Sequence, residues 1–113
     1  MRTEYINRLP EDWLPTARVF SALGEATRQQ ILLLFEPGEE LSIKDISAMF
    51  SMGRSTIVHH LSVLQEAGIV AVRRQGRQAL YSICYEPLLE SLEKLRLYIE
   101  SDLDILTEKN ATR

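Results

Sequence analysis

Apolar residues recur every three or four positions over most of this chain, which is the spacing of amphipathic α-helices. A first helix is predicted over about residues 10–23, because Pro10 and two acidic residues suit a first helical turn and Gly24 follows the last apolar position. The amphipathic face of this helix consists of Trp13, Leu14, Ala17, Phe20 and Ser21. A second helix is predicted over residues 26–35, with Pro37-Gly38 ending it. Its core-facing residues are Ile31, Leu34 and Phe35.

Two further helices, joined by the short turn of residues 51–53, are predicted within about residues 42–67. Ser42 and Asp45 have the spacing of a capping box, in which each side chain hydrogen-bonds the backbone of the other. The inward residues of this short helix are Ile43, Ile46 and Met49. The next helix extends from Arg54 to Ala67, and Gly68 suits the positive φ just past a helix end. Its inward stripe is Ile57, Leu61 and Leu64.

The pattern then changes to two short apolar runs on either side of a charged, glycine-containing turn. Residues 69–72 and 79–83 are predicted to be strands, and residues 73–78 their turn. The sequence therefore predicts a β-hairpin over about residues 69–84 within a single, mostly helical domain that spans residues 1–113.

A last long helix is predicted over about residues 87–107, beginning at Pro87. Its apolar stripe is Leu88, Leu92, Leu95, Ile99, Leu103 and Leu106. This stripe is too long to be covered entirely by a domain of this size, although packing within the chain alone is the alternative. A two-fold dimer in which this helix lies beside the first helix would bury the stripe. The predicted interface consists of Trp13, Leu14, Ala17 and the six residues of that stripe.

Composition narrows the class of protein. With 45% hydrophobic and 26% charged residues, the chain has the average make-up of a globular domain. The longest apolar run, Ile31 to Phe35, is far shorter than the ~20 residues of a membrane helix, and residues 1–5 lack the apolar core of a signal peptide. A lone cysteine, Cys84, forms neither an internal disulfide nor a thiolate cage. We therefore expect a cytoplasmic protein with no membrane partner.

Charge is unevenly distributed along the chain, although the net charge is only -3. Residues 1–50 carry five Lys or Arg against eight Asp or Glu, and residues 86–113 carry four against seven. Residues 51–85 reverse this balance, since Arg54, Arg73, Arg74 and Arg77 face the single acid Glu66. This asymmetry indicates a basic working surface on an acidic scaffold.

Two short helices joined by a three-residue turn form a helix-turn-helix, whose second helix normally enters the major groove of DNA. The outward face of that helix carries hydroxyl and imidazole groups, which hydrogen-bond to base edges or phosphates: Ser55, Thr56, His59 and Ser62. The hairpin places basic and amide groups around one turn, as a wing that follows the DNA backbone or minor groove: Arg73, Arg74, Gln75, Arg77 and Gln78. The sequence therefore predicts a winged helix-turn-helix that binds DNA. No phosphate loop, nucleophile elbow or metal-ligand pair indicates an enzyme.

Three segments resemble one known family. Residues 55–70, Ser-Thr-Ile-Val-His-His-Leu-Ser-Val-Leu-Gln-Glu-Ala-Gly-Ile-Val, are similar to the recognition helix of the ArsR/SmtB family of bacterial winged-helix repressors. Residues 20–28 resemble the entry to that family's second helix, and residues 73–77 its wing. The resemblance covers roughly residues 18–84. It implies a homodimeric transcriptional repressor that binds inverted-repeat operators and is released by an effector.

The chain departs from the family pattern at three positions. Val58 stands where a serine is usual and is suited to contact a thymine methyl group. Gly53 replaces a serine helix cap, and Ser51 a turn glycine. Two residues have alternative roles: His60 contacts DNA or hydrogen-bonds within the helix-turn-helix, and Lys44 contacts a phosphate or is simply solvated. The full predicted DNA-contact set is Lys44, Arg54, Ser55, Thr56, Val58, His59, His60, Ser62, Arg73, Arg74, Gln75, Arg77 and Gln78.

No metal or other cofactor is predicted. The family's third-helix thiolate site resembles Glu-Leu-Cys-Val-Cys-Asp-Leu, whereas this chain has Ser42 and Lys44 in place of the cysteines. Residues 86–113 contain no histidine for the last-helix zinc site, and the adjacent His59 and His60 do not converge on one ion. Cys84 is interpreted as a small buried hydrophobic residue rather than as a redox sensor.

The effector is therefore a small organic molecule in a pocket at the dimer interface, or there is none. The alternative function is a winged-helix protein-interaction module, or a co-regulator or activator with weak affinity for DNA. The arginine-rich wing and the hydroxyl-bearing helix face favour DNA binding over protein interaction.

Overall fold

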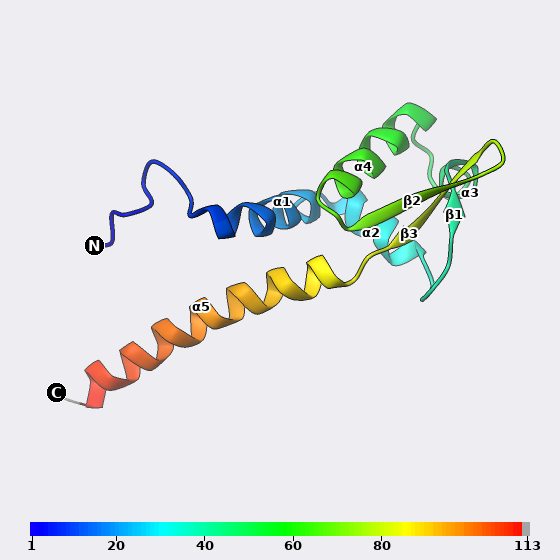
Figure 1. Cartoon of the computed structure of the whole chain (residues 1–113). Coiled ribbons are helices and arrows are strands. Elements are labelled where there is room, and N and C mark those ends of the chain that lie inside the picture. Colours follow the sequence, from blue (N-terminus) through cyan, green and yellow to red (C-terminus); the bar gives the residue numbers. More distant parts are fainter. Residues whose placement is uncertain (112–113) are drawn as a thin grey trace.

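The computed structural model describes residues 1–111, which form five α-helices, one 3-10 turn and a three-stranded sheet (Figure 1). In chain order the elements are η1 (Glu11–Trp13), α1 (Leu14–Leu23), α2 (Ala26–Leu34), β1 (Leu41–Ser42), α3 (Ile43–Ser47), α4 (Arg54–Glu66), β2 (Val70–Gln75), β3 (Gln78–Ile83) and α5 (Glu86–Ala111). The predicted fold class, mostly helical with a small β-hairpin in a winged helix-turn-helix, is confirmed.

The helix-turn-helix forms for local reasons that the sequence predicted. In the capping box of α3, the Asp45 amide donates to Ser42 Oγ at 3.1 Å and the Ser42 amide to Asp45 Oδ2 at 3.1 Å. At the end of α4, Gly68 has a φ of 79°, and the following amide of Ile69 donates to the carbonyl of Leu64 at 2.9 Å. These bonds satisfy helix-end groups that are otherwise left without partners.

The core lies between α1, α2, α3, α4 and the inner face of the sheet. The predicted stripe of α4 is fully buried there, together with these residues of the surrounding elements: Val19, Ala22, Ile31, Phe35, Ile46, Ile69, Val70 and Tyr81. One inward assignment is wrong, because Met49 is 65% exposed. The α3 helix has only five residues and ends at Ser47, so Met49 is no longer on the helical face that Ile46 occupies.

The sheet is larger than the predicted hairpin. Both strands continue into the region predicted to be the turn, which shortens the connection to Gly76 and Arg77, with Gly76 at a φ of 62°. A third strand, β1, pairs antiparallel with β3, giving the order β1-β3-β2. Strand β1 has no signal in the sequence, since two residues are too short to show an alternating pattern.

The two terminal helices extend away from this core. Helix α1 buries Thr16, Val19 and Ala22, whereas Leu14 on its predicted amphipathic face is exposed. Helix α5 contacts α1 and then continues in the same direction as the N-terminal segment, where Arg2 pairs with Asp102 at 2.8 Å (Figure 1). The overall dimensions are consequently elongated, at 65 × 30 × 25 Å. No helix in the described part of the chain is long and apolar enough to cross a membrane.

Candidate nucleic-acid interface

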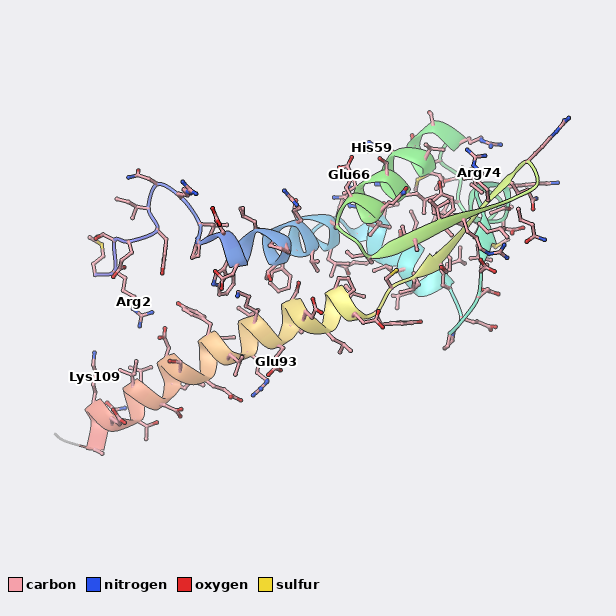
Figure 2. The ribbon with its side chains drawn as sticks, in the orientation of Figure 1. Arg2, His59, Glu66, Arg74, Glu93 and Lys109 are labelled. Atoms are coloured by element: carbon pink, nitrogen blue, oxygen red, sulfur yellow. The ribbon has the colours of Figure 1, made fainter. Side chains whose placement is uncertain are left out.

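The outward face of α4 is free in the folded chain. The polar residues predicted to read DNA from this helix are all exposed, and Val58 lies among them: Ser55, Thr56, His59 and Ser62. Figure 2 shows His59 on the side of α4 that faces away from the rest of the domain. Burial of Ile57, Leu61 and Leu64 on the opposite side fixes the helix in this orientation. The side chains on the free face therefore have access to a groove of DNA.

His60 differs from the other residues of this set. Its side chain is only 12% exposed, and its Nδ1 atom lies 3.2 Å from the guanidinium of Arg28 and 3.8 Å from the carboxylate of Glu25. Of the two roles left open for His60, the internal hydrogen bond is the one present in the structure. The imidazole thus bonds to Arg28 of α2 rather than within α3 and α4, and its contact with DNA stays a prediction.

Arg28 has contacts that nothing in its sequence surroundings indicates. Its Nε atom donates to the carbonyl of Ala22 at 2.6 Å and another of its nitrogens lies 3.4 Å from the carbonyl of Ser21, both at the end of α1. With the bond to His60, one guanidinium joins α1, α2 and α4. The family resemblance includes Arg28 in the segment that leads into the second helix, but it implies no role for this side chain. Arg28 is thus a positioning residue for the outward-facing helix.

The wing divides its arginines between two faces of the sheet, because successive strand residues point to opposite sides. Arg73 pairs with Glu40, with nitrogen–oxygen distances of 2.5 and 2.8 Å, and also donates to Gln75 at 3.1 Å. The hydrogen bond from Arg73 holds the pKa of the Glu40 carboxyl below its usual value. A carboxylate therefore already pairs with the guanidinium of Arg73, and the DNA contact of this residue stays a prediction.

Arg74 lies on the other face, which looks toward α3 and the start of α4 (Figure 2). There the chain forms a hollow of about 440 Å³ whose lining includes four basic side chains: Lys44, Arg54, Arg74 and Arg77. Ser42, Ile43, Gln78, Ala79 and Tyr81 complete the lining. We call this feature the cationic hollow. Within residues 1–111 none of its four basic side chains forms an ion pair or a hydrogen bond. The hollow brings together residues that are far apart in the sequence.

The residues predicted for the dimer interface lie along α1 and α5. Leu14, Leu92, Ile99, Leu103 and Leu106 are exposed in the single chain. Ala17, Leu88 and Leu95 are half-buried, and Leu88 packs partly against the core of its own chain. Trp13 is also half-buried, with its ring edge-on to that of Tyr98 at a centroid distance of 6.1 Å. Much of this apolar surface is therefore available to a partner.

Ser42 and Lys44, at the family's metal positions, and the lone Cys84 have the following structural settings. Ser42 is the helix cap of α3, and Lys44 lines the cationic hollow. Among the described residues, no three or more His, Cys, Asp or Glu side chains are grouped so as to hold a metal ion. Cys84 is half-buried rather than fully buried, and its backbone amide donates to the carbonyl of Ile69 at 2.8 Å.

Comparison with known proteins agrees with this geometry. Residues 25–72, from the start of α2 into β2, match the model of the family described as "bacterial regulatory protein, arsR family". The chain is 30% identical over 98 residues to a cadmium resistance transcriptional regulatory protein CadC homolog of Staphylococcus aureus, covering 82% of this chain and 81% of that protein. It is 31% identical over 81 residues to the transcriptional repressor SdpR of Bacillus subtilis, covering 72% and 89%.

The chain belongs to the ArsR family. Its fold is similar to that of the solved ArsR-like transcriptional regulator from Rhodococcus sp. RHA1, with a TM-score of 0.76 and 26% identity over 89% of this chain and 95% of that one. As a member of the ArsR family, the protein is a DNA-binding transcriptional regulator. The family resemblance stated from residues 18–84 is confirmed.

Proposed function

We propose that this ArsR-family protein is a homodimeric repressor that binds an inverted-repeat operator in double-stranded DNA. The observation that carries the proposal is the position of the cationic hollow beside the start of α4, whose outward face is polar and exposed. Phosphate groups are bound by such basic side chains, and base edges by the hydroxyl, imidazole and apolar groups of a recognition helix. Both kinds of contact are thus available within one surface.

The DNA contacts divide into two groups in this proposal. Base readout comes from Ser55, Thr56, Val58, His59 and Ser62 of α4. Backbone contacts come from Lys44, Arg54, Arg74, Arg77 and Gln78 around the hollow. Arg73, Gln75 and His60 act instead through the hydrogen bonds described above, which hold the wing and the recognition helix in place.

Dimerisation is supported by the apolar surface of α1 and α5. Leucine and isoleucine side chains rarely stay exposed in such numbers along one helix of a monomeric protein. A two-fold axis between these helices would bury them isologously and present two copies of α4 to one face of DNA. A separation of about one helical turn, roughly 34 Å, would match the two halves of a palindromic operator.

No metal or other cofactor enters this proposal, since the residues at the family's thiolate positions are Ser42 and Lys44. Release from DNA is therefore assigned to a small organic effector or to a change in protein concentration. A regulator that acts on chromosomal DNA works in the compartment that holds the chromosome, which in a bacterium is the cytoplasm.

Fluorescence anisotropy on DNA from upstream of the protein's own gene tests the proposal. We expect saturable binding that resists a scrambled competitor, with two chains per site and an affinity that falls as salt rises. Scrambled DNA that competes as well as the specific fragment would contradict binding to this operator. It would direct the search to other genomic sites or to protein partners of the winged helix.

A further inference from the structure

We propose that His60 is a proton-controlled positioning residue, whose neutral imidazole fixes α4 for DNA binding and whose protonated form releases this helix. The inference rests on the proposed function, because it concerns how the helix that contacts DNA is held. Three side chains take part, and we call them the His60 cluster: His60 of α4, and Glu25 and Arg28 at the start of α2.

The hydrogen bond between Arg28 and His60 requires a neutral imidazole. A guanidinium has only donors, so Nδ1 of His60, which lies 3.2 Å from Arg28, is the acceptor and the ring proton is on Nε2. The same guanidinium donates to the carbonyls of Ala22 and Ser21 on α1. The neutral form of His60 therefore connects the recognition helix to the end of α1 through a single side chain.

Glu25 is a second partner, which the neutral imidazole does not use. Its Oε2 atom is buried, has no hydrogen-bond partner among the described residues and lies 3.8 Å from Nδ1 of His60. That distance is too long for a hydrogen bond, although a buried carboxylate oxygen without a donor is energetically costly. A protonated imidazole would supply both the missing donor, Nδ1–H, and the opposite charge after a small movement of the ring.

Protonation therefore exchanges one partner of His60 for the other. An imidazolium has no acceptor for Arg28, and the two like charges repel each other. The bond that joins Arg28 to α4 is lost, whereas Arg28 keeps its carbonyl partners on α1. Histidine is the side-chain type that ordinarily changes its charge between about pH 5 and 8. We expect the contribution of His60 to DNA affinity to decrease as the pH is lowered through this range.

The other groups around the imidazole do not take part in this exchange. His59 is its neighbour on α4, with the ring centroids 5.8 Å apart, but this side chain is exposed on the outward face. Protonation of His59 places a positive charge beside DNA and should raise the affinity. Helix α1 faces the cluster with the carbonyls of Ser21 and Ala22, which do not titrate. The two histidines thus predict opposite effects of pH on DNA binding.

Fluorescence anisotropy on operator DNA between about pH 5.5 and 8, at constant ionic strength, compares the full-length protein with His60→Asn. Asparagine places an amide oxygen close to the position of Nδ1, so it accepts from Arg28 at every pH. The ratio of the wild-type Kd to the variant Kd should rise about tenfold from the high to the low end of this range, which corresponds to one lost hydrogen bond to a charged group. His59 is present in both proteins, so its effect cancels in the ratio. A ratio that stays constant with pH would overturn the proposal.

Glu25→Gln removes the anion that pairs with the protonated ring. This variant should lose DNA affinity at lower pH than the wild type does, because its imidazolium has no opposite charge nearby. The matched control is Glu66→Gln, which removes the same charge at an exposed position of α4 and should leave the shape of the pH profile unchanged. Identical profiles for Glu25→Gln and the wild type would contradict the exchange of partners.

Nitrogen-15 NMR of the two histidines measures the exchange in the absence of DNA. At the high end of this pH range the His60 ring should carry its proton on Nε2, and at the low end it should be an imidazolium. A proton on Nδ1 at high pH, or a ring that stays neutral at low pH, would overturn the proposal. Failure of the proposed function would look different, because no variant would then bind the operator specifically at any pH while the NMR titration stayed as expected.

Discussion

Helices α4 and α5 carry similar apolar stripes, and the folded chain buries only one of them. In α4, Leu61 and the other two stripe residues are 0% exposed, because α1, α2, α3 and the sheet surround them. In α5, Leu92 is 58% exposed and Leu103 is 54% exposed, because α1 and the N-terminal residues that pair with this helix leave these side chains uncovered. The spacing of apolar residues along a helix therefore predicts which face of the helix is apolar. The neighbouring elements determine whether that face is buried within the chain or stays exposed to a partner.

The largest expected effect lies in the buried stripe. Leu61→Ala should lower the free energy of unfolding by about 2–5 kcal/mol, because it removes a fully buried side chain and leaves a cavity. Urea denaturation followed by circular dichroism measures this change. The matched substitution Leu103→Ala in α5 should have a much smaller effect under conditions where the protein is monomeric. Equal losses for the two variants would contradict the difference between the helices.

The second effect lies in the exposed stripe. The double substitution Leu92→Glu and Leu103→Glu should raise the dimer Kd by about 100-fold or more, because two apolar contacts are replaced by charges in an interface. Sedimentation at several protein concentrations measures this Kd. Ser101→Glu adds a charge at an exposed polar position of α5 and serves as the control. A double variant that stays dimeric would place the interface elsewhere.

The wing provides a third and smaller test, on adjacent residues. Arg74→Ala should lower the slope of log affinity for DNA against log salt by about one, because one phosphate contact is lost. Arg73→Ala should change the slope less, because Glu40 already pairs with this guanidinium. Anisotropy titrations at four or more salt concentrations give both slopes. A larger decrease for Arg73→Ala would reverse the assignment of the two faces.

The smallest effect is expected at the helix cap of α3. Ser42→Ala should cost about 1 kcal/mol of stability, because the amide of Asp45 loses its acceptor. The pKa of Asp45 lies below its usual value owing to the hydrogen bonds from the backbone and side chain of Ser42. The contribution of Asp45 is thus present above the unfolded pKa of about 3.9 and is lost as the pH falls through the folded pKa.

Chemical denaturation across the acidic range measures this pH dependence. The wild-type protein should lose stability as the pH falls, and Ser42→Ala should show a shallower dependence because one of the bonds to Asp45 is missing. Asp45→Asn, which removes the titrating group, is the reference variant. A pH dependence that is unchanged in Asp45→Asn would show that other carboxylates account for the loss.

The sequence by itself determined the features that depend on neighbouring residues. The periodicity of Ile57, Leu61 and Leu64, the capping box of Ser42 and the positive φ of Gly68 are all present as predicted. Each arises from bonds or spacings within a few positions of the chain, which the residue types alone specify. The winged helix-turn-helix followed from these local patterns, and the family from the resemblance of residues 20–28, 55–70 and 73–77.

The tertiary structure alone decided which polar side chains remain free for DNA. Arg73 and Arg74 are equivalent in sequence, but strand alternation and the position of Glu40 leave only Arg74 beside Lys44 and Arg54. The imidazole of His60 likewise hydrogen-bonds with Arg28, which lies 32 positions earlier in the chain. Such pairings depend on how distant segments pack, because a charged group pairs with the opposite charge or hydrogen-bond acceptor that the fold places near it.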